Sequence, residues 1–414
     1  MKFRRGHAIP SVAMAIAVLL CVVAAGLSAK PSTLLISIDG FRWDYIDLHP
    51  CPTIRGLVAR GVRAEGLIPC FPSNTFPSHY SIVTGLRPES HGLVSNNMFD
   101  PEWNEFFGIG SHPAAREGKW WGGEPIWNTA TRQGRTSASY FWPGSEADIQ
   151  GKFPTWWHPY NYKVPFEERM SEVVGWLSLP AAERPAVVTF YFVEVDDAGH
   201  WFGPTSKEAG TAVAKVDAQL GQLLAAIESA GVADEVDIIL VSDHGMAETV
   251  FERTFVLSEY LEPDETQIDF TGSFAGIRPR GIDTDTIVAR LQDVNPHIKV
   301  YRREDVPARF HFSSHRRIPE VVLIADEGWQ IERVPPKREY YEKRKRGSHG
   351  FDNALVSMRG LFVAAGPSFP KGRQIPAFES IHIYNLICAI TGLEPAPNDG
   401  DDRLVRWLVD GGEP

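Results

Sequence analysis

Short, uninterrupted apolar runs alternate with amphipathic stretches along most of this chain. Such runs are typical of β-strands covered on both faces, whereas apolar positions repeating every three or four residues predict helices. The predicted strands are 32–38, 62–68, 186–195, 237–241 and 360–365. The predicted helices are 53–60, one that runs through Thr84 and ends at Gly85, 166–177, 207–230 and 380–391. This alternation predicts an α/β fold, a doubly wound, mostly parallel sheet with helices on both faces.

Two segments depart from the alternation. Residues 101–165 carry many Trp and Tyr side chains among Gly and Pro with little periodicity. This composition predicts a loop insertion beside the candidate functional residues described below. Residues 254–345 contain strand-like runs at 268–275 and 320–325, which predict a smaller β-rich subregion. We therefore expect a single domain over 30–414 with these two insertions.

Residues 1–29 form a different kind of segment. Basic residues precede an apolar run over 12–27, and small residues follow, which is the pattern of a cleaved secretory signal peptide. A membrane anchor is the alternative, but the run is shorter than the roughly 20 residues that span a bilayer. Leu20 is too large for the small residue that precedes a lipid-modified cysteine such as Cys21. We expect an exported protein, periplasmic or secreted, without a stable membrane anchor after cleavage.

The overall charge limits the partners. The chain is 43% hydrophobic and 22% charged, as in soluble globular proteins, and its net charge is −11. Duplex nucleic acid is disfavoured as a partner, because contacts to its phosphates need a basic face. Small phosphate esters stay compatible, since bound divalent cations can reverse the local charge. A basic run over 337–346 fits either a solvated surface or a segment that steers an anionic substrate.

Three cysteines remain after cleavage of the signal peptide. In an exported chain we expect one disulfide and one buried thiol. Cys51 and Cys70 are the favoured pair, because both are predicted at the same end of the sheet, which leaves Cys388 as the thiol.

Acidic and imidazole side chains stand at the ends of the predicted strands or just beyond them. They are Asp39, Asp196, His200, Asp243, His244 and His349. Each alone is compatible with a turn, a helix cap or an ordinary histidine, but open α/β sheets place their active sites at this edge. Mixed Asp and His donors suit zinc, and two sets of them would clamp the attacking and leaving oxygens of a phosphoryl transfer.

The segment 72–79 supplies a candidate nucleophile, Thr75, in a hydroxyl-bearing turn before a helix. An alcohol is hardly ionised at pH 7, so it needs a base or a metal ion to become reactive. Backbone N–H groups at the start of the helix favour a phosphoryl oxygen. One metal ion would hold Thr75 as an alkoxide, and the other would stabilise the leaving group.

Four motifs occur in an order known from one family. They are Asp39-Gly40-Phe41-Arg42, Asn74-Thr75-Phe76-Pro77-Ser78-His79, Ser242-Asp243-His244-Gly245-Met246 and Gly347-Ser348-His349-Gly350. On these motifs the chain resembles the nucleotide pyrophosphatase/phosphodiesterase family of the alkaline phosphatase superfamily, in its bacterial exported form. The resemblance covers nearly all of the mature chain. It implies zinc-dependent hydrolysis of nucleotide phosphodiester or phosphoanhydride bonds with release of nucleoside 5′-monophosphates.

The resemblance also implies roles for individual residues. One zinc ion would be held by Asp39, Thr75, Asp243 and His244, and the second by Asp196, His200 and His349. Thr75 would form a phosphoryl-threonine intermediate that water hydrolyses. Asn96, with the backbone N–H of Thr75 or Phe76, would bind a phosphoryl oxygen. Phe76 and Tyr160 would stack on a nucleobase.

Other activities of the superfamily make different demands on the sequence. Phosphomonoesterases place an arginine near the nucleophile, and none lies between Arg63 and Arg87, which favours a diester. A phosphodiesterase acting on phospholipid headgroups of the phosphocholine type is the alternative within the family. Residues 70–73 overlap a sulfatase signature, but Asn74 replaces its arginine. The complete ligand sets and the intact threonine argue against a binding protein without turnover.

Overall fold

The computed structural model describes residues 30–110, 112–344 and 346–414, and 31–414 form one compact unit. The signal peptide predicted over 1–29 lies outside the described residues and stays a prediction. Within the described part of the chain, no helix combines the length and the apolar character needed to cross a bilayer.

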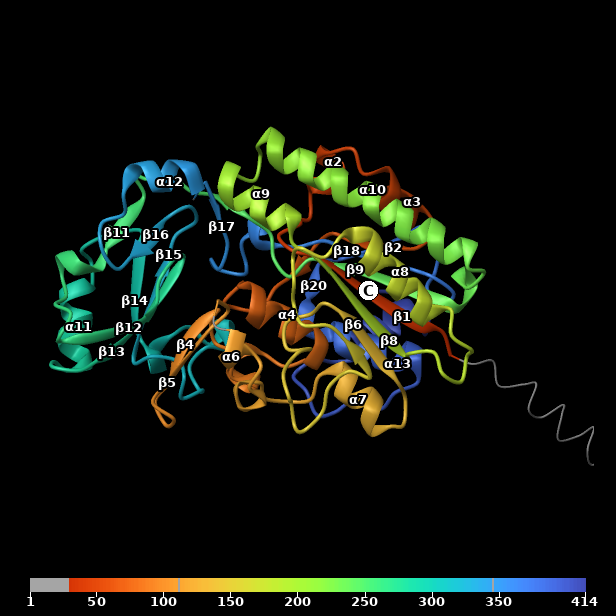
Figure 1. Cartoon of the computed structure of the whole chain (residues 1–414). Coiled ribbons are helices and arrows are strands. Elements are labelled where there is room, and N and C mark those ends of the chain that lie inside the picture. The colour runs from red at the N-terminus through yellow and green to blue at the C-terminus, as the bar shows by residue number, and fades with distance from the viewer. Residues whose placement is uncertain (1–29, 111, 345) are drawn as a thin grey trace, which may run out of the picture. The chain divides into compact units, whose positions relative to one another are not determined.

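A central sheet of eight strands, counted over the described residues, organises this unit (Figure 1). Its strand order is β19-β2-β18-β9-β1-β8-β6-β7, and β1 pairs in parallel with both β8 and β9. Strand β18 runs antiparallel to both of its neighbours. The mostly parallel sheet confirms the predicted fold class. The strands are β1 (Ser32–Ile38), β2 (Val62–Ala64), β6 (Ser137–Tyr140), β7 (Trp156–Trp157), β8 (Val187–Phe192), β9 (Val236–Val241), β18 (Phe362–Ala365) and β19 (Arg373–Ile375).

Helices pack on both faces of the sheet because successive side chains of a strand point to opposite faces. In β1, Leu35 belongs to one apolar cluster, whereas Leu34 and Ile36 belong to the other. Burial of each such side chain contributes about 1.5–3 kcal/mol, and the central strands β1, β8 and β9 have no exposed position. The first cluster includes residues of α4 (Thr75–Thr84), α7 (Ile126–Arg132) and α13 (Ile383–Thr391). The second includes residues of α3 (Pro52–Ala59), α8 (Phe166–Leu177) and α10 (Lys207–Ser229).

A smaller antiparallel sheet, in the order β12-β13-β15-β14, forms the β-rich subregion predicted over 254–345. One of its faces shares a third apolar cluster with helix α11 (Thr284–Leu291). The strands are β12 (Thr266–Phe270), β13 (Phe274–Pro279), β14 (Ile298–Arg302) and β15 (Val321–Ala325).

Short strands pair outside these two sheets. They are β3 (Leu67–Ile68) with β20 (Phe378–Glu379), β4 (Asn97–Asp100) with β5 (Glu105–Gly108), β10 (Ala247–Glu248) with β17 (Gly347–Ser348), and β11 (Thr254–Val256) with β16 (Gln330–Glu332). The remaining α-helices of the described residues are α2 (Tyr45–Leu48), α5 (Pro88–His91), α6 (His112–Ala115), α9 (Glu194–Phe202), α12 (Arg338–Arg344) and α14 (Arg403–Leu408).

The basic run over 337–346 lies largely on α12. Arg338 forms ion pairs with Glu252 at 2.8 Å and with Glu342 at 3.1 Å. Lys343 pairs with Glu339 at 2.7 Å. These ion pairs compensate part of the basic charge. The structure of α12 therefore fits a solvated surface better than a segment that steers an anionic substrate.

Residues 101–165 are more regular than the sequence predicts. This segment contains α7, β6 and β7, and both strands belong to the central sheet. The prediction of a loop insertion is therefore wrong for these parts. Strand β6 reads Ser-Ala-Ser-Tyr, so it lacks the branched apolar run of its neighbours. The Thr189 hydroxyl donates to Ser139 Oγ at 2.8 Å, whereas Ser137 Oγ is buried without a hydrogen-bond partner among the described residues.

The predicted disulfide between Cys51 and Cys70 is wrong, since both are free, buried thiols, as is Cys388. Cys51 precedes α3 and packs in the same apolar cluster as α10. Cys70 lies beside Ser380, with 3.9 Å between Sγ and Oγ. The prediction considered only the end of the sheet at which each cysteine lies, and the environments of the two thiols differ.

We expect all three thiols to be unreactive in the native protein lacking residues 1–29. Burial raises the pKa of Cys51 and of Cys388 to about 12 and also raises that of Cys70, so little thiolate is present. After unfolding in guanidinium chloride without reductant, a chromogenic thiol reagent should detect three thiols. If only one thiol is detected before reductant is added, the protein contains the disulfide that the sequence predicts.

Candidate active site

The turns that follow β1 and β9 bring acidic side chains to one edge of the sheet. Asp39 follows β1 directly, and Gly40 then turns the chain with a φ of 64°. A Cβ atom on Gly40 would lie 2.9 Å from the Asp196 backbone, so this close approach requires glycine. Asp243 and His244 follow β9 after one intervening serine and are buried.

Helix α9 supplies two further side chains. The strand predicted over 186–195 ends at Phe192, and α9 occupies its last positions. Asp196 and His200 lie one helical turn apart on the same face, with 3.5 Å between His200 Nε2 and Asp196 Oδ2. His349 follows β17, and its Nε2 lies 4.0 Å from Asp196 Oδ1.

These side chains form overlapping clusters in which the potential ligand atoms lie within 4.8 Å of one another. The clusters found among the described residues are Asp196 with His200 and His349, Asp39 with Asp196 and His244, and Asp39 with His79 and Asp243. The structure therefore brings together all six acidic and imidazole residues singled out from the sequence. Asp196 belongs to two clusters, whereas the resemblance assigned it to one zinc ion alone.

All three of the predicted histidine ligands are oriented through Nδ1. In each, this atom lies at hydrogen-bonding distance from a backbone carbonyl oxygen: His200 from Gly347 at 2.8 Å, His244 from Gly245 at 2.9 Å and His349 from Ser73 at 2.9 Å. Because a carbonyl only accepts, Nδ1 carries a proton, and Nε2 is the ring nitrogen that faces the cluster. Proteins orient neutral imidazole ligands towards metal ions in this way.

The electrostatics of the cluster favour bound cations. Oδ1 of Asp39 and Oδ1 of Asp196 are buried without a hydrogen-bond partner among the described residues. Burial, and then the charges of Asp243 and Asp196, raise the pKa of Asp39 well above its ordinary value. Burial, and then the charges of His244 and His200, lower the pKa of His349 well below its usual range. Converging carboxylates and imidazole nitrogens fit divalent metal ions, which would compensate this charge.

Thr75 lies at the first position of α4, after Asn74 in an extended conformation. Its Oγ1 is 3.5 Å from His244 Nε2, so the hydroxyl borders the cluster. The Phe76 N–H, expected from the resemblance as a donor to substrate, instead donates to Asn96 Oδ1 at 2.9 Å. This bond leaves the Asn96 Nδ2 group as the side-chain donor beside Thr75.

Sequence reasoning missed two residues that hold the cluster in place. His79 Nδ1 lies 2.8 Å from the Thr75 carbonyl oxygen and 3.2 Å from Asp243 Oδ2. The Tyr191 hydroxyl donates to Asp39 Oδ2 at 2.5 Å. The spacing of four residues between Thr75 and His79 on one helix is a signal that could have identified His79. For Tyr191, the sequence shows only a buried strand.

A cavity of about 270 Å³, which we call the aromatic cavity, opens beside Thr75. Phe76 and Tyr160 both line it, so the two residues predicted to stack on a base share one cavity. The Phe76 ring centroid lies 5.8 Å from that of Trp121, and the Tyr160 centroid lies 5.3 Å from that of Phe141. Other lining residues include Asp39, Thr75, Ile109, Trp142, Tyr191, Asp196 and Asp197.

An α/β sheet with clustered Asp and His side chains beyond its strand ends is the arrangement of the alkaline phosphatase fold. A solved structure with this fold is that of murine ectonucleotide pyrophosphatase/phosphodiesterase 5, an inactive threonine-to-alanine variant in complex with AMP. It superimposes with a TM-score of 0.87 and 34% identity and covers 92% of this chain and 100% of its own.

The family model of type I phosphodiesterase/nucleotide pyrophosphatase matches residues 33–352, and the chain belongs to this family. A venom phosphodiesterase from Macrovipera lebetinus is 39% identical over 390 residues, which are 91% of this chain and 45% of that protein. Human ectonucleotide pyrophosphatase/phosphodiesterase family member 1 is also 39% identical over 390 residues, 92% of this chain and 42% of that protein. The chain thus spans less than half the length of these curated relatives.

We expect a chelator to lower the melting temperature of the protein, and more strongly at about pH 8 than at about pH 5. In the metal-free state the raised pKa of Asp39 means that folding costs stability as the pH rises above the unfolded value of about 4. Bound cations remove this cost, and protons compete with them for the ligands at low pH. Scanning calorimetry with and without chelator measures the difference at each pH. If the chelator leaves the melting temperature unchanged at both pH values, the metal site is contradicted.

Metal content tests individual ligands. His200→Ala should reduce the metal bound per chain, as measured by mass spectrometry of the elements. His297→Ala is the matched control, because His297 is exposed and pairs with Asp326 outside the cluster. Equal metal content in both variants would remove His200 from the ligand set.

Proposed function

We propose that the chain is a zinc-dependent phosphodiesterase/pyrophosphatase that cleaves nucleotide phosphodiester or phosphoanhydride bonds and releases nucleoside 5′-monophosphates. The observation that carries this proposal is the position of Thr75, 3.5 Å from His244 at the start of α4 and in the wall of the aromatic cavity. Family membership supports hydrolysis of diesters. The AMP complex of the murine relative supports a nucleotide substrate, and its inactive threonine-to-alanine variant supports a threonine nucleophile.

Two zinc ions fit the donor atoms of the site. One would be held by Asp39, Thr75, Asp243 and His244, and the other by Asp196, His200 and His349. Bound there, the ions supply positive charge that favours the ionised threonine hydroxyl and offsets the charge of the phosphoryl and leaving oxygens.

The chain's own residues carry out two successive displacements. Thr75 Oγ1 attacks phosphorus, a bond from Oγ1 to phosphorus forms, and the bond to the leaving oxygen breaks. The threonine proton passes to solvent, and the leaving group departs and takes up a proton. Water then attacks the phosphoryl-threonine, which breaks the bond to Oγ1, releases the monophosphate and restores the hydroxyl. Asn96 Nδ2 donates to a non-bridging oxygen in both steps.

The aromatic cavity would hold the nucleoside that stays on the phosphoryl group. Phe76 and Tyr160 present ring faces on which a base can stack. The names of the relatives, venom and ecto enzymes, support export of this chain, for which residues 1–29 would be the signal.

We expect Thr75→Ala to lower kcat for a nucleotide phosphodiester by several orders of magnitude, as when other activated nucleophiles are removed. Metal content should persist, because Asp39, Asp243 and His244 still offer three ligands. Thr75→Ser keeps a hydroxyl and should retain part of the activity. Stopped assays with the p-nitrophenyl ester of thymidine 5′-monophosphate measure all variants.

Cys70→Ser tests the sulfatase alternative with the same assays. Cys70 is buried beside Ser380, so its replacement should leave the rate of diester hydrolysis largely unchanged. An active Thr75→Ala variant, together with a Cys70→Ser variant that loses sulfate ester hydrolysis, would assign the chain to the sulfatases.

A headgroup phosphodiesterase is the second candidate. The rings of Phe141 and Tyr160, with Asp197 in the same cavity, would also suit a quaternary ammonium group. We expect kcat/KM to be higher for the thymidine ester than for p-nitrophenyl phosphorylcholine. The reverse order would assign the cavity to choline headgroups.

A further inference from the structure

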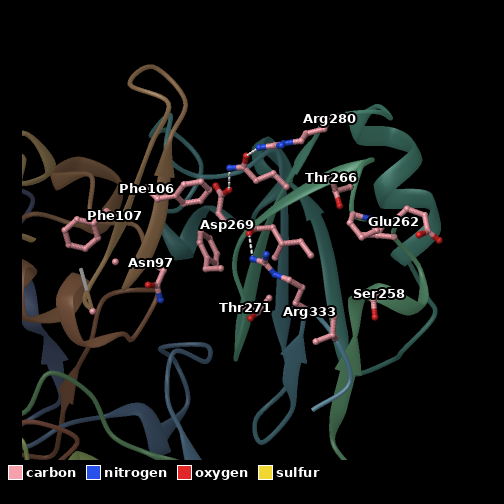
Figure 2. A pocket seen from close by; sticks show the side chains of 18 residues that line it. Asn97, Phe106, Phe107, Ser258, Glu262, Thr266, Asp269, Thr271, Arg280 and Arg333 are labelled. Carbon is pink, nitrogen blue, oxygen red and sulfur yellow. Dashed lines mark hydrogen bonds between the residues drawn. The ribbon is translucent and has the colours of Figure 1, made fainter. Parts of the chain in front are cut away.

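A second and larger cavity, of about 910 Å³, lies between the β4–β5 hairpin and strand β12 (Figure 2). We call it the arginine groove, because Arg280 and Arg333 line it together with the exposed ring of Phe106. The chemistry proposed above uses none of these three residues. Their placement raises the question of which ligand reaches them.

The arginine groove and the aromatic cavity share a wall. Ile109 lines the aromatic cavity, whereas its neighbour Gly108 lines the groove. The Ile109 N–H donates to the Asn96 carbonyl oxygen at 3.0 Å, which fastens this wall beside the proposed phosphoryl site. Asn97, the next residue, lines the groove. The groove therefore begins one residue away from the side chain assigned to the phosphoryl oxygen.

A second segment connects the groove with the cluster of Asp196, His200 and His349. Thr271 lines the groove, and Ser273 donates through its hydroxyl to the His349 carbonyl oxygen at 2.6 Å. A metal ion held by this cluster would offset the charge of the leaving oxygen, because the other metal ion would hold Thr75. In an in-line displacement the leaving group departs on the side opposite the attacking oxygen, which would be the side of this cluster.

The charge of the groove suits an anionic chain. Among the described residues, neither Arg280 nor Arg333 has an ion-pair partner, and their hydrogen bonds go to the Gln267 side chain and the Ile268 carbonyl oxygen. The Asp269 carboxylate accepts from Arg278 at 2.8 Å and from Gln267 at 2.7 Å, so its charge is already compensated.

The remaining carboxylate and the aromatic ring of the groove lie on different sides. Glu262 lies away from the hairpin, whereas Phe106 faces the groove from the hairpin side (Figure 2). Phe106 is 57% exposed although its ring packs against that of Phe99 with 4.7 Å between the centroids, so part of the ring surface is accessible to a planar group. Unpaired guanidinium groups beside an exposed ring are the features that bind phosphates with attached bases.

We propose that the arginine groove is the leaving-group subsite, which binds the part of the substrate beyond the scissile bond when that part carries further phosphates. The proposal rests on the proposed function, since it needs a phosphoryl transfer at Thr75. The shared chemistry is a phosphate-bearing chain, either the polyphosphate bridge of a dinucleotide or the backbone of a single-stranded oligonucleotide.

Leaving groups with and without phosphate test the proposal. We compare the p-nitrophenyl ester of thymidine 5′-monophosphate, a dinucleoside tetraphosphate and a short oligothymidylate. The double variant Arg280→Gln/Arg333→Gln should lose about tenfold in kcat/KM on the two phosphate-bearing substrates, mainly through KM, as expected for two exposed charge contacts. It should stay within about twofold of the unchanged protein on the p-nitrophenyl ester, whose leaving group carries no phosphate. This comparison also shows that the variant is folded.

Matched variants separate charge from structure. Arg280→Lys/Arg333→Lys keeps both positive charges and should recover much of the lost kcat/KM. Arg60→Gln removes an exposed arginine at the end of α3, outside the groove, and should change nothing. For the phosphate-bearing substrates, added salt should raise KM less steeply in the double glutamine variant than in the unchanged protein.

The outcomes distinguish this subsite from the proposed function. A loss on only one phosphate-bearing substrate supports the subsite and identifies its natural occupant. Unchanged kinetics on both, or an equal loss on all three substrates, overturns it. An unchanged protein that fails to cleave even the p-nitrophenyl ester would overturn the proposed function instead.

Discussion

The mutual repulsion of three carboxylates is the constraint on which this structure depends. Asp39, Asp196 and Asp243 converge at one edge of the central sheet, largely removed from water, where like charges are costly. The protein offsets part of this cost with its own groups. Tyr191 donates to Asp39, and two imidazoles contact Asp243. The oxygens left without partners point to cations as the remaining part of the compensation.

The surrounding fold keeps these groups from moving apart. Strands β1, β8 and β9 are buried along their whole length, and each carries its functional side chains only a few residues beyond its end. Such short connections allow little rearrangement, so the ligand geometry is set before any ion or substrate arrives. The same rigidity extends to the nucleophile, because His349 bonds to the Ser73 carbonyl in the loop that precedes Thr75.

The sequence predicted those parts whose signals are local. Buried strands appear in the sequence as apolar runs. The apolar runs therefore predict most of the central sheet and the residues that follow β1 and β9. Strand β6 was missed because two of its four residues are serines, and α9 because Val195 extends the apolar run of β8 into it. The cysteine pairing failed because spacing does not reveal the surroundings of a thiol. The arginine groove was beyond sequence reasoning, since its walls come from segments more than 150 residues apart, around Asn97 and Thr266.

Because the two cavities share a wall, a change in the length of this wall alters the lining of both. Along residues 108–110, successive positions face opposite cavities, and isoleucine on one side alternates with glycine on the other. Strand β5 ends at Gly108, and Ile109 and Gly110 lie in the turn that follows it. An inserted residue here would change which side chain faces each cavity. Changes in the length of this turn are therefore expected to be rare wherever both cavities must keep their shape.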